Sequence, residues 1–139
     1  MREIRFRGRH VARVTWVYGH LLAPNIIGVV KEVDNGDGRG YHPEIIEFCL
    51  VDRESVGQYT GLKDKNGVEI YKGDIVRYKI SGSAIVGDVR WSDKSAAFEK
   101  RAERSYIIGE DWYYKPVASY LSSTEVIGNI CENPELLNV

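Results

Sequence analysis

The stretch VGQYTGLKDKNGVEIYKGDIV, residues 56–76, decides the fold of this chain. Within it, Asp64 can start a type I turn and cap it with its carboxylate, and Gly67 can take the left-handed position of a bulge. A second turn, at residues 72–74, leads into an apolar segment. The stretch therefore predicts a tight hairpin followed by a buried strand, which is a scaffold without a catalytic constellation.

The segments that follow this hairpin predict a meander. Residues 75–80 and 85–91 alternate between apolar and charged side chains, as half-buried strands do. We expect residues 96–98 to return as a third strand. A helix over residues 95–104 is the competing prediction, because Ala, Glu, Lys and Arg favour helix, and the charged second half of that segment stays open. Strands joined by short loops are typical of an SH3-like or pseudo-barrel core.

The rest of the chain predicts strands on both sides of this core. Residues 34–40, rich in Gly and Asx, predict an exposed, mobile loop. Asn133 as N-cap and Pro134 at the first helical position predict one helical turn. Further strands are expected at residues 4–11, 14–22, 26–33, 45–51 and 125–130.

We therefore expect a mainly β fold, α+β at most, in one domain over residues 1–139. Residues 1–55 form an added N-terminal sheet in this prediction. Residues 56–139 form the barrel-like core, its closing strand and the helical turn. A chain of 139 residues is long enough to bury such a core without disulfides or metals.

The composition of the chain limits the kinds of partner and the cell compartment that we expect. The 19 basic and 20 acidic residues give a net charge of −1, so no global field attracts nucleic acid or membranes. No apolar run approaches the ~20 residues of a membrane span, and the charged N-terminus is unlike a signal peptide. Cys49 and Cys131 are isolated, which favours reduced thiols. We expect a cytoplasmic protein with no membrane partner.

Four segments together resemble one protein family. They are MREIRFR at residues 1–7, WVYG at 16–19, the stretch at 56–76, and EVIGNICENPEL at 125–136. With these segments the chain resembles the YopX family of phage and prophage proteins. The resemblance implies a mobile-element origin and a β-rich domain. It brings no established activity, cofactor or catalytic residue, so none is transferred to this chain.

Arginines near the N-terminus are the strongest local charge signal. Five of them, against Glu3 alone, give an excess of +4 within thirteen residues. A strand over residues 4–9 would line one face with guanidinium groups that can neutralise successive phosphates. A solvated face or ion pairs with acidic neighbours is the alternative. The candidate nucleic-acid-binding residues are Arg5, Arg7 and Arg9, extended by Arg77, Lys79 and Arg90 on one face of the meander.

Aromatic side chains gather late in the sequence, with Lys115 beside them. Such residues can stack on single-stranded bases, but they serve cores and subunit contacts as well. The cluster consists of Tyr106, Trp112, Tyr113, Tyr114 and Tyr120. We expect Trp112, Tyr113 and Tyr114 to form an interaction surface.

Metal and enzyme motifs are missing from the sequence. His10, His20, His42 and Cys49 lack the paired spacing of zinc ligands. There is no P-loop, no Gly-x-Gly-x-x-Gly, no Gly-x-Ser-x-Gly and no His-Glu-x-x-His. We expect no metal, no cofactor and no enzymatic activity, although a catalytic set dispersed along the sequence remains a third hypothesis.

The sequence thus leaves two main functional hypotheses. The first is a phage-derived, non-enzymatic binding module that contacts nucleic acid through the N-terminal arginine strand. The second is an oligomeric interaction or assembly module that binds its own copy, or a phage or host protein, and does not bind nucleic acid.

Overall fold

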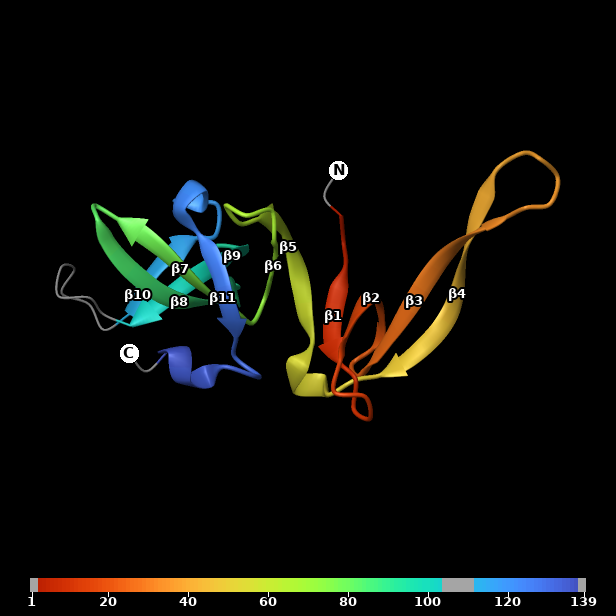
Figure 1. Cartoon of the computed structure of the whole chain (residues 1–139), viewed down its shortest axis with the longest axis horizontal. Helices are drawn as coiled ribbons and strands as arrows, with labels where there is room; N and C mark the ends of the chain where they lie inside the picture. The colour runs from red at the N-terminus through yellow and green to blue at the C-terminus, as the bar shows by residue number, and fades with distance from the viewer. Residues whose placement is uncertain (1–2, 104–111, 138–139) are drawn as a thin grey trace. The chain divides into compact units, whose positions relative to one another are not determined.

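The computed structural model describes residues 3–103 and 112–137. The chain divides into two compact units, Met1–Gln58 and Tyr59–Val139, shown in Figure 1. Both units are built from antiparallel strands. Whether they fold together as a single domain stays a prediction.

The first unit is a twisted antiparallel sheet with strand order β4-β3-β2-β1. The first two residues of β5, Gly57 and Gln58, pair with β1. β3 and β4 run beside each other as a long hairpin (Figure 1). The elements are β1 (Phe6–Arg9), β2 (Trp16–Ala23), β3 (Ile26–Asp34), β4 (Tyr41–Leu50), the 3-10 turn η1 (Arg53–Ser55) and the start of β5 (Gly57–Lys63).

One face of this sheet carries the core of the first unit. Ile27, Cys49 and Val51 are buried at its centre. Phe6 and Val17 pack against them from β1 and β2, together with two further valines. These residues share a face because side chains alternate along each strand, so every second residue points the same way.

The second unit is a five-stranded sheet with order β10-β9-β8-β7-β11, and β6 beside the rest of β5. Its core contains Ile70, Val76, Tyr78, Val89 and Phe98. The elements are β6 (Glu69–Tyr71), β7 (Asp74–Ile80), β8 (Ser83–Ser92), β9 (Ala97–Glu103), β10 (Trp112–Pro116), η2 (Leu121–Ser123), β11 (Glu125–Asn129) and η3 (Pro134–Leu137).

Asp64 organises the predicted hairpin turn. Its Oδ1 accepts hydrogen bonds from the backbone N–H groups of Asn66 and Val68, at 2.8 and 2.9 Å. Gly67 has a φ of 81°, in the left-handed region that glycine adopts without steric cost. The other carboxylate oxygen, Oδ2, accepts from the N–H of Val126 on β11. The predicted turn is confirmed, and its capping residue also fixes the closing strand.

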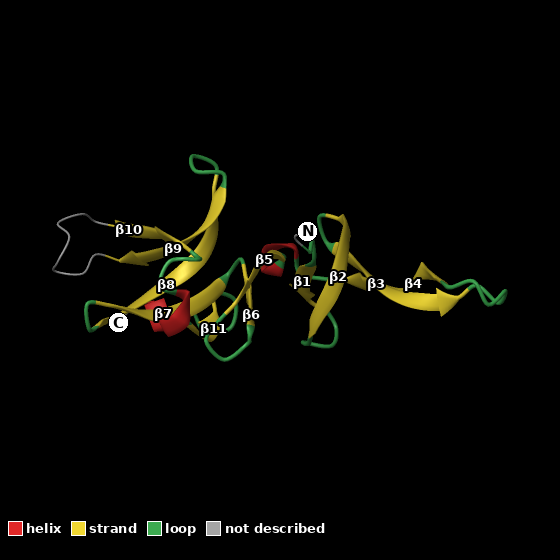
Figure 2. Cartoon of the chain, turned by 90° about the horizontal axis from the view of Figure 1, so that it is seen from above, coloured by secondary structure: helices red, strands yellow, loops and turns green. Residues whose placement is uncertain are grey.

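The prediction of a mainly β fold is confirmed. Figure 2 shows that helical structure among the described residues is confined to short turns, including the expected turn at the C-terminal end. The barrel part of the prediction needs correction. β10 and β11 are the two ends of an open sheet, since no pairing joins them in the described parts of the chain.

The strand expected at residues 96–98 is confirmed, and the charged half of segment 95–104 that the sequence left open continues it as far as residue 103. β9 spans Ala97–Glu103 and pairs with β8 from Ser92↔Ala97 to Gly87↔Ala102. Its polar residues favour helix only in the absence of tertiary contacts. Pairing with β8 overrides that preference, because it buries the ring of Phe98 in the core.

Candidate functional site

The three N-terminal arginines differ in their surroundings. Arg5 precedes β1 and its Nε lies 3.5 Å from a carboxylate oxygen of Glu3. Arg7 is only 8% exposed, and its guanidinium carbon lies 4.7 Å from the ring centroid of Trp16. Arg9 is half-buried and lies opposite Trp16 in the β1–β2 register. This strand therefore does not present three solvated cations in a row.

The second group of predicted cations lies on one face of the β7–β8 hairpin. The register Ile75↔Asp88 and Lys79↔Ala84 places Arg77, Lys79 and Arg90 on the side opposite the core. Arg77 pairs with Glu125 at 2.9 Å. Arg90 pairs with Asp88 at 3.0 Å. Two of these three cations are therefore matched by carboxylates.

The two cation groups belong to different units, so their union into one patch stays a prediction. Lys79 is exposed, and no carboxylate of the described residues pairs with it. Surface ion pairs such as that of Arg77 are weak, and phosphate could compete for these guanidinium groups. Their carboxylate partners nevertheless lower the local positive potential.

The predicted aromatic surface lies on an edge strand. Trp112, Tyr113 and Tyr114 belong to β10, which pairs with β9 on one side. Their side chains, and the whole of Tyr106, lie outside the described residues. Tyr120 is exposed and has a left-handed backbone with φ of 56°. The interaction role of this cluster stays a prediction.

An exposed apolar surface on the first unit was missed by sequence reasoning. Five large side chains, each between 45% and 68% exposed, gather on β2 and β4. We call this set the apolar face, and it consists of Tyr18, Leu22, Ile45, Phe48 and Leu50. Contiguous exposed apolar surface of this kind marks interaction sites more often than scattered single residues do.

The strand register shows that these residues share one side of the sheet. Phe48 lies opposite Gly28, and Leu50 lies opposite Ile26. Gly28 is also the partner of His20, two residues from Tyr18 on the same side of β2. A Cβ on Gly28 would touch Leu22 and Ile45, so both side chains lie over it. The opposite side of the same strands carries the buried core.

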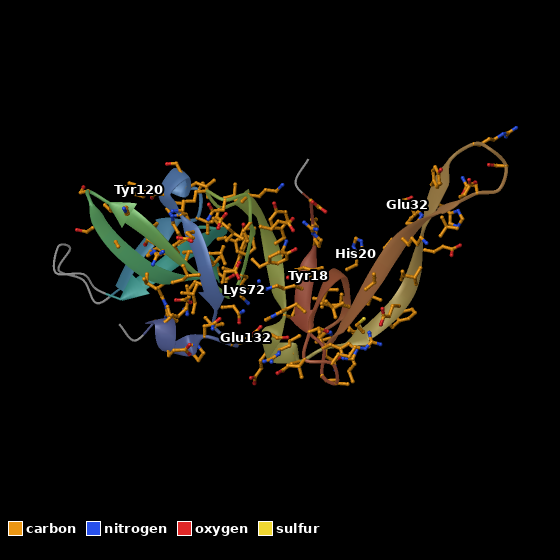
Figure 3. All side chains as sticks on the ribbon, viewed as in Figure 1. Tyr18, His20, Glu32, Lys72, Tyr120 and Glu132 are labelled. Carbon is orange, nitrogen blue, oxygen red and sulfur yellow. The ribbon has the colours of Figure 1, made fainter. Side chains whose placement is uncertain are left out.

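Charged residues flank the apolar face. Alternation along β3 puts Glu32 on the same side as Gly28, and Figure 3 labels it together with Tyr18 and His20. Arg9 lies on this side of β1, through its register with Trp16. Neither Arg9 nor Glu32 forms an ion pair with another described residue. The face therefore has a basic border on β1 and an acidic border on β3.

A buried lysine of the second unit has a perturbed pKa. Lys100 is fully buried, and its Nζ donates to the carbonyl of Ser119 and to Thr124 Oγ1. The same Nζ lies 4.1 Å from the ring centroid of Tyr78. Burial lowers the pKa of Lys100 to about 8. Through these two hydrogen bonds, the lysine links β9 to the segment at residues 119–124.

Two further observations concern metals and membranes. Among residues 3–103 and 112–137, no three His, Cys, Asp or Glu side chains form a cluster that could hold a metal ion. The same residues contain no helix with the length and apolar character needed to cross a bilayer.

Comparison with known proteins gives the class of this chain. The model of the family described as YopX protein matches residues 5–138, nearly the whole sequence. The chain belongs to the YopX protein family. It is also similar to a solved structure, protein EF1440 from Enterococcus faecalis, with 25% sequence identity, a TM-score of 0.60 and 99% of each chain covered. No curated protein matches it.

Proposed function

We propose that this chain is a non-enzymatic interaction module that associates with a second copy of itself through the apolar face. The observation that supports this most is Phe48, which is 68% exposed on an edge strand with Leu50 and Ile45 on the same side. Burying such side chains is favourable by about 25 cal/mol for each Å² removed from water. A phage or prophage origin and a cytoplasmic location belong to the same proposal.

Charge complementarity favours a second copy as the occupant. Self-association about a two-fold axis places the same surface on both copies, so opposite borders of the face meet. A copy turned by 180° about the strand direction brings β1 over the β3–β4 side of the first. Arg9 of each copy then approaches Glu32 of the other, and the apolar residues pack between them.

The nucleic-acid hypothesis based on the N-terminal strand receives less support. Arg7 is buried against Trp16, and Arg5 is already near Glu3. Phosphate binding by this strand would require Arg7 to leave its aromatic contact, at a cost comparable to the cation–π energy of about 0.5–2 kcal/mol.

Sedimentation velocity over a range of concentrations tests self-association. We expect a dimer that dissociates on dilution, and we expect Phe48→Thr to shift it towards monomer. Threonine keeps the preference for strand while removing the ring. Val68→Thr is the matched control, because Val68 is exposed outside the apolar face. A wild-type chain that is monomeric at every concentration would contradict the proposal.

A charge exchange tests the proposed arrangement of the two copies. Arg9→Glu alone should weaken the dimer, since it places carboxylates opposite one another. Combining Arg9→Glu with Glu32→Arg should restore the wild-type association. Lack of any recovery in the double variant would reject this two-fold arrangement.

A further inference from the structure

The loop that connects β3 and β4 contains the dipeptide Asn35-Gly36, and both residues are exposed (Figure 1). In such a pair the backbone nitrogen of the glycine can attack the side-chain amide of the asparagine, because glycine has no Cβ to block the approach. A Cβ built on Gly36 would meet no atom within 4 Å, so the space around it is open. The loop therefore leaves room for a five-membered ring to close between the two residues.

The backbone nitrogen of Gly36 is in contact with a proton acceptor. Its N–H donates to Oδ1 of Asp34 at 2.8 Å. Asp34 is the last residue of β3, and the hairpin is closed next to it by the N–H of Asn35, which donates to the carbonyl of Gly40 at 3.0 Å. A carboxylate held in this contact can take the proton of the nitrogen as that nitrogen becomes a nucleophile.

The side-chain amide of Asn35 is contacted by a histidine from the other strand. Nδ1 of His42 donates to Oδ1 of Asn35, and Nε2 of His42 donates to a carboxylate oxygen of Glu44 at 2.7 Å. Amide and carboxylate oxygens only accept hydrogen bonds, so both contacts form together in the imidazolium, which carries two N–H groups. A donor at Oδ1 stabilises the negative charge that develops on this oxygen when the amide carbon is attacked.

We propose that Asn35 is a self-modification site, at which the chain converts this asparagine through a succinimide. The nitrogen of Gly36 forms a bond to Cγ of Asn35 and gives its proton to Asp34. The bond between Cγ and Nδ2 then breaks, and Nδ2 leaves as ammonia after taking a proton from His42. Solvent carries the proton from Asp34 back to the histidine. Water opens the ring and leaves aspartate or isoaspartate at position 35, with one more negative charge on the loop. The proposal is independent of self-association.

A second Asn-Gly pair in the same chain provides an internal comparison. Asn66 and Gly67 lie in the turn of the second unit that Asp64 caps. There the N–H of Gly67 donates to the backbone carbonyl of Asp64 at 3.0 Å, and a carbonyl oxygen is a much weaker base than a carboxylate. The sequence of the second unit contains no histidine. We therefore expect Asn66 to convert much more slowly than Asn35.

Mass spectrometry of peptides from the full chain, incubated at neutral pH and sampled over several weeks, tests the proposal. Conversion changes the peptide mass by the difference between an amide and an acid, and fragmentation assigns the change to Asn35 or Asn66. We expect Asn35 to convert about ten-fold faster than Asn66 in the folded chain. In guanidinium chloride the two rates should approach each other, because the contact with His42 is lost. Equal rates in the folded chain, or an Asn35 that stays intact, would overturn the proposal.

Variants of the exposed loop separate proton transfer from loop structure. Asp34→Ser keeps a hydrogen-bond acceptor at this position but removes the base, so conversion of Asn35 should slow by about ten-fold. His42→Gln should slow it by about three-fold or more, because the cationic donor is lost. Asp37→Ser is the matched control, since Asp37 accepts from the N–H of Arg39 in the same loop. Conversion as fast in Asp34→Ser as in Asp37→Ser would show only the ordinary reactivity of an exposed Asn-Gly pair and reject the proposed site.

Discussion

The carboxylate of Asp64 accepts a hydrogen bond from the backbone N–H of Val126 at 2.9 Å, although 62 positions separate the two residues in the sequence. The neighbouring N–H of Lys65 donates to the carbonyl of Thr124 at 2.9 Å. One turn thus joins the central hairpin to the closing strand. The hydrogen bonds of Asp64 and the left-handed backbone of Gly67 explain why these residue types stand in the turn.

Removing the Asp64 carboxylate should destabilise the second unit. Asp64→Ala loses acceptors for three backbone N–H groups, those of Asn66, Val68 and Val126. We expect the free energy of unfolding to fall by about 3 kcal/mol, measured by urea denaturation. Asp37→Ala is the control, because among the described residues the Asp37 carboxylate accepts one hydrogen bond, from the exposed N–H of Arg39. Similar losses in the two variants would refute the structural role.

Stability should depend on the protonation of Lys100 at alkaline pH. Its pKa is about 8 in the folded chain and 10.5 ordinarily, so the unfolded chain binds more protons between these values. The free energy of unfolding therefore rises with pH in this window, relative to Lys100→Met. We expect this difference to change by about 1.5 kcal/mol between pH 8 and 9.5 in urea titrations. A difference that is flat with pH would contradict the burial of the ammonium.

Two glycines of the first unit should differ in their tolerance of alanine. A Cβ on Gly19 would lie 2.3 Å from the carbonyl oxygen of Gly28, a backbone atom that cannot move without disturbing β3. A Cβ on Gly28 would instead meet the end of the Leu22 side chain at 2.7 Å, and that side chain is exposed. Gly19→Ala should lower the free energy of unfolding by about 1–3 kcal/mol, and Gly28→Ala should lower it by clearly less. Thermal unfolding of both variants checks the order.

The two cysteines should react at different rates. Burial raises the pKa of the Cys49 thiol, and the nearby carboxylate of Glu47 raises it further. Cys131 is exposed. In the native chain, an aromatic disulfide reagent should modify Cys131 rapidly and Cys49 only slowly, because the thiolate is the nucleophile. Rapid reaction of two thiols per chain without denaturant would show that the reagent reaches Cys49, and this would contradict its burial in the core of the first unit.

Local features of the fold were predictable from sequence. The turn at Asp64 and Gly67 depends on residues within four positions of each other, and it forms as expected. The alternation along residues 75–80 correctly placed Val76 and Tyr78 in the core and Arg77 outside it. Such patterns can be recognised from the sequence of a single strand, without knowledge of its neighbours.

Features that depend on distant contacts were not predictable. The sequence analysis expected Arg7 on an open strand face, but Arg7 is buried and lies over the ring of Trp16 from β2. The sequence analysis also missed the burial of Lys100, whose Nζ reaches Ser119 and Thr124 and lies over the ring of Tyr78. The apolar face was missed because Tyr18, Leu22 and Phe48 come from strands far apart in the sequence. Only the register of β2, β3 and β4 brings them together.

Amide hydrogen exchange measured at several protein concentrations is the most direct test of self-association through the apolar face. The account predicts that exchange in residues 45–50 slows as concentration rises and that exchange in residues 83–92 does not change. Phe48→Thr should abolish this dependence. Exchange in residues 45–50 that is the same at all concentrations would contradict the central claim.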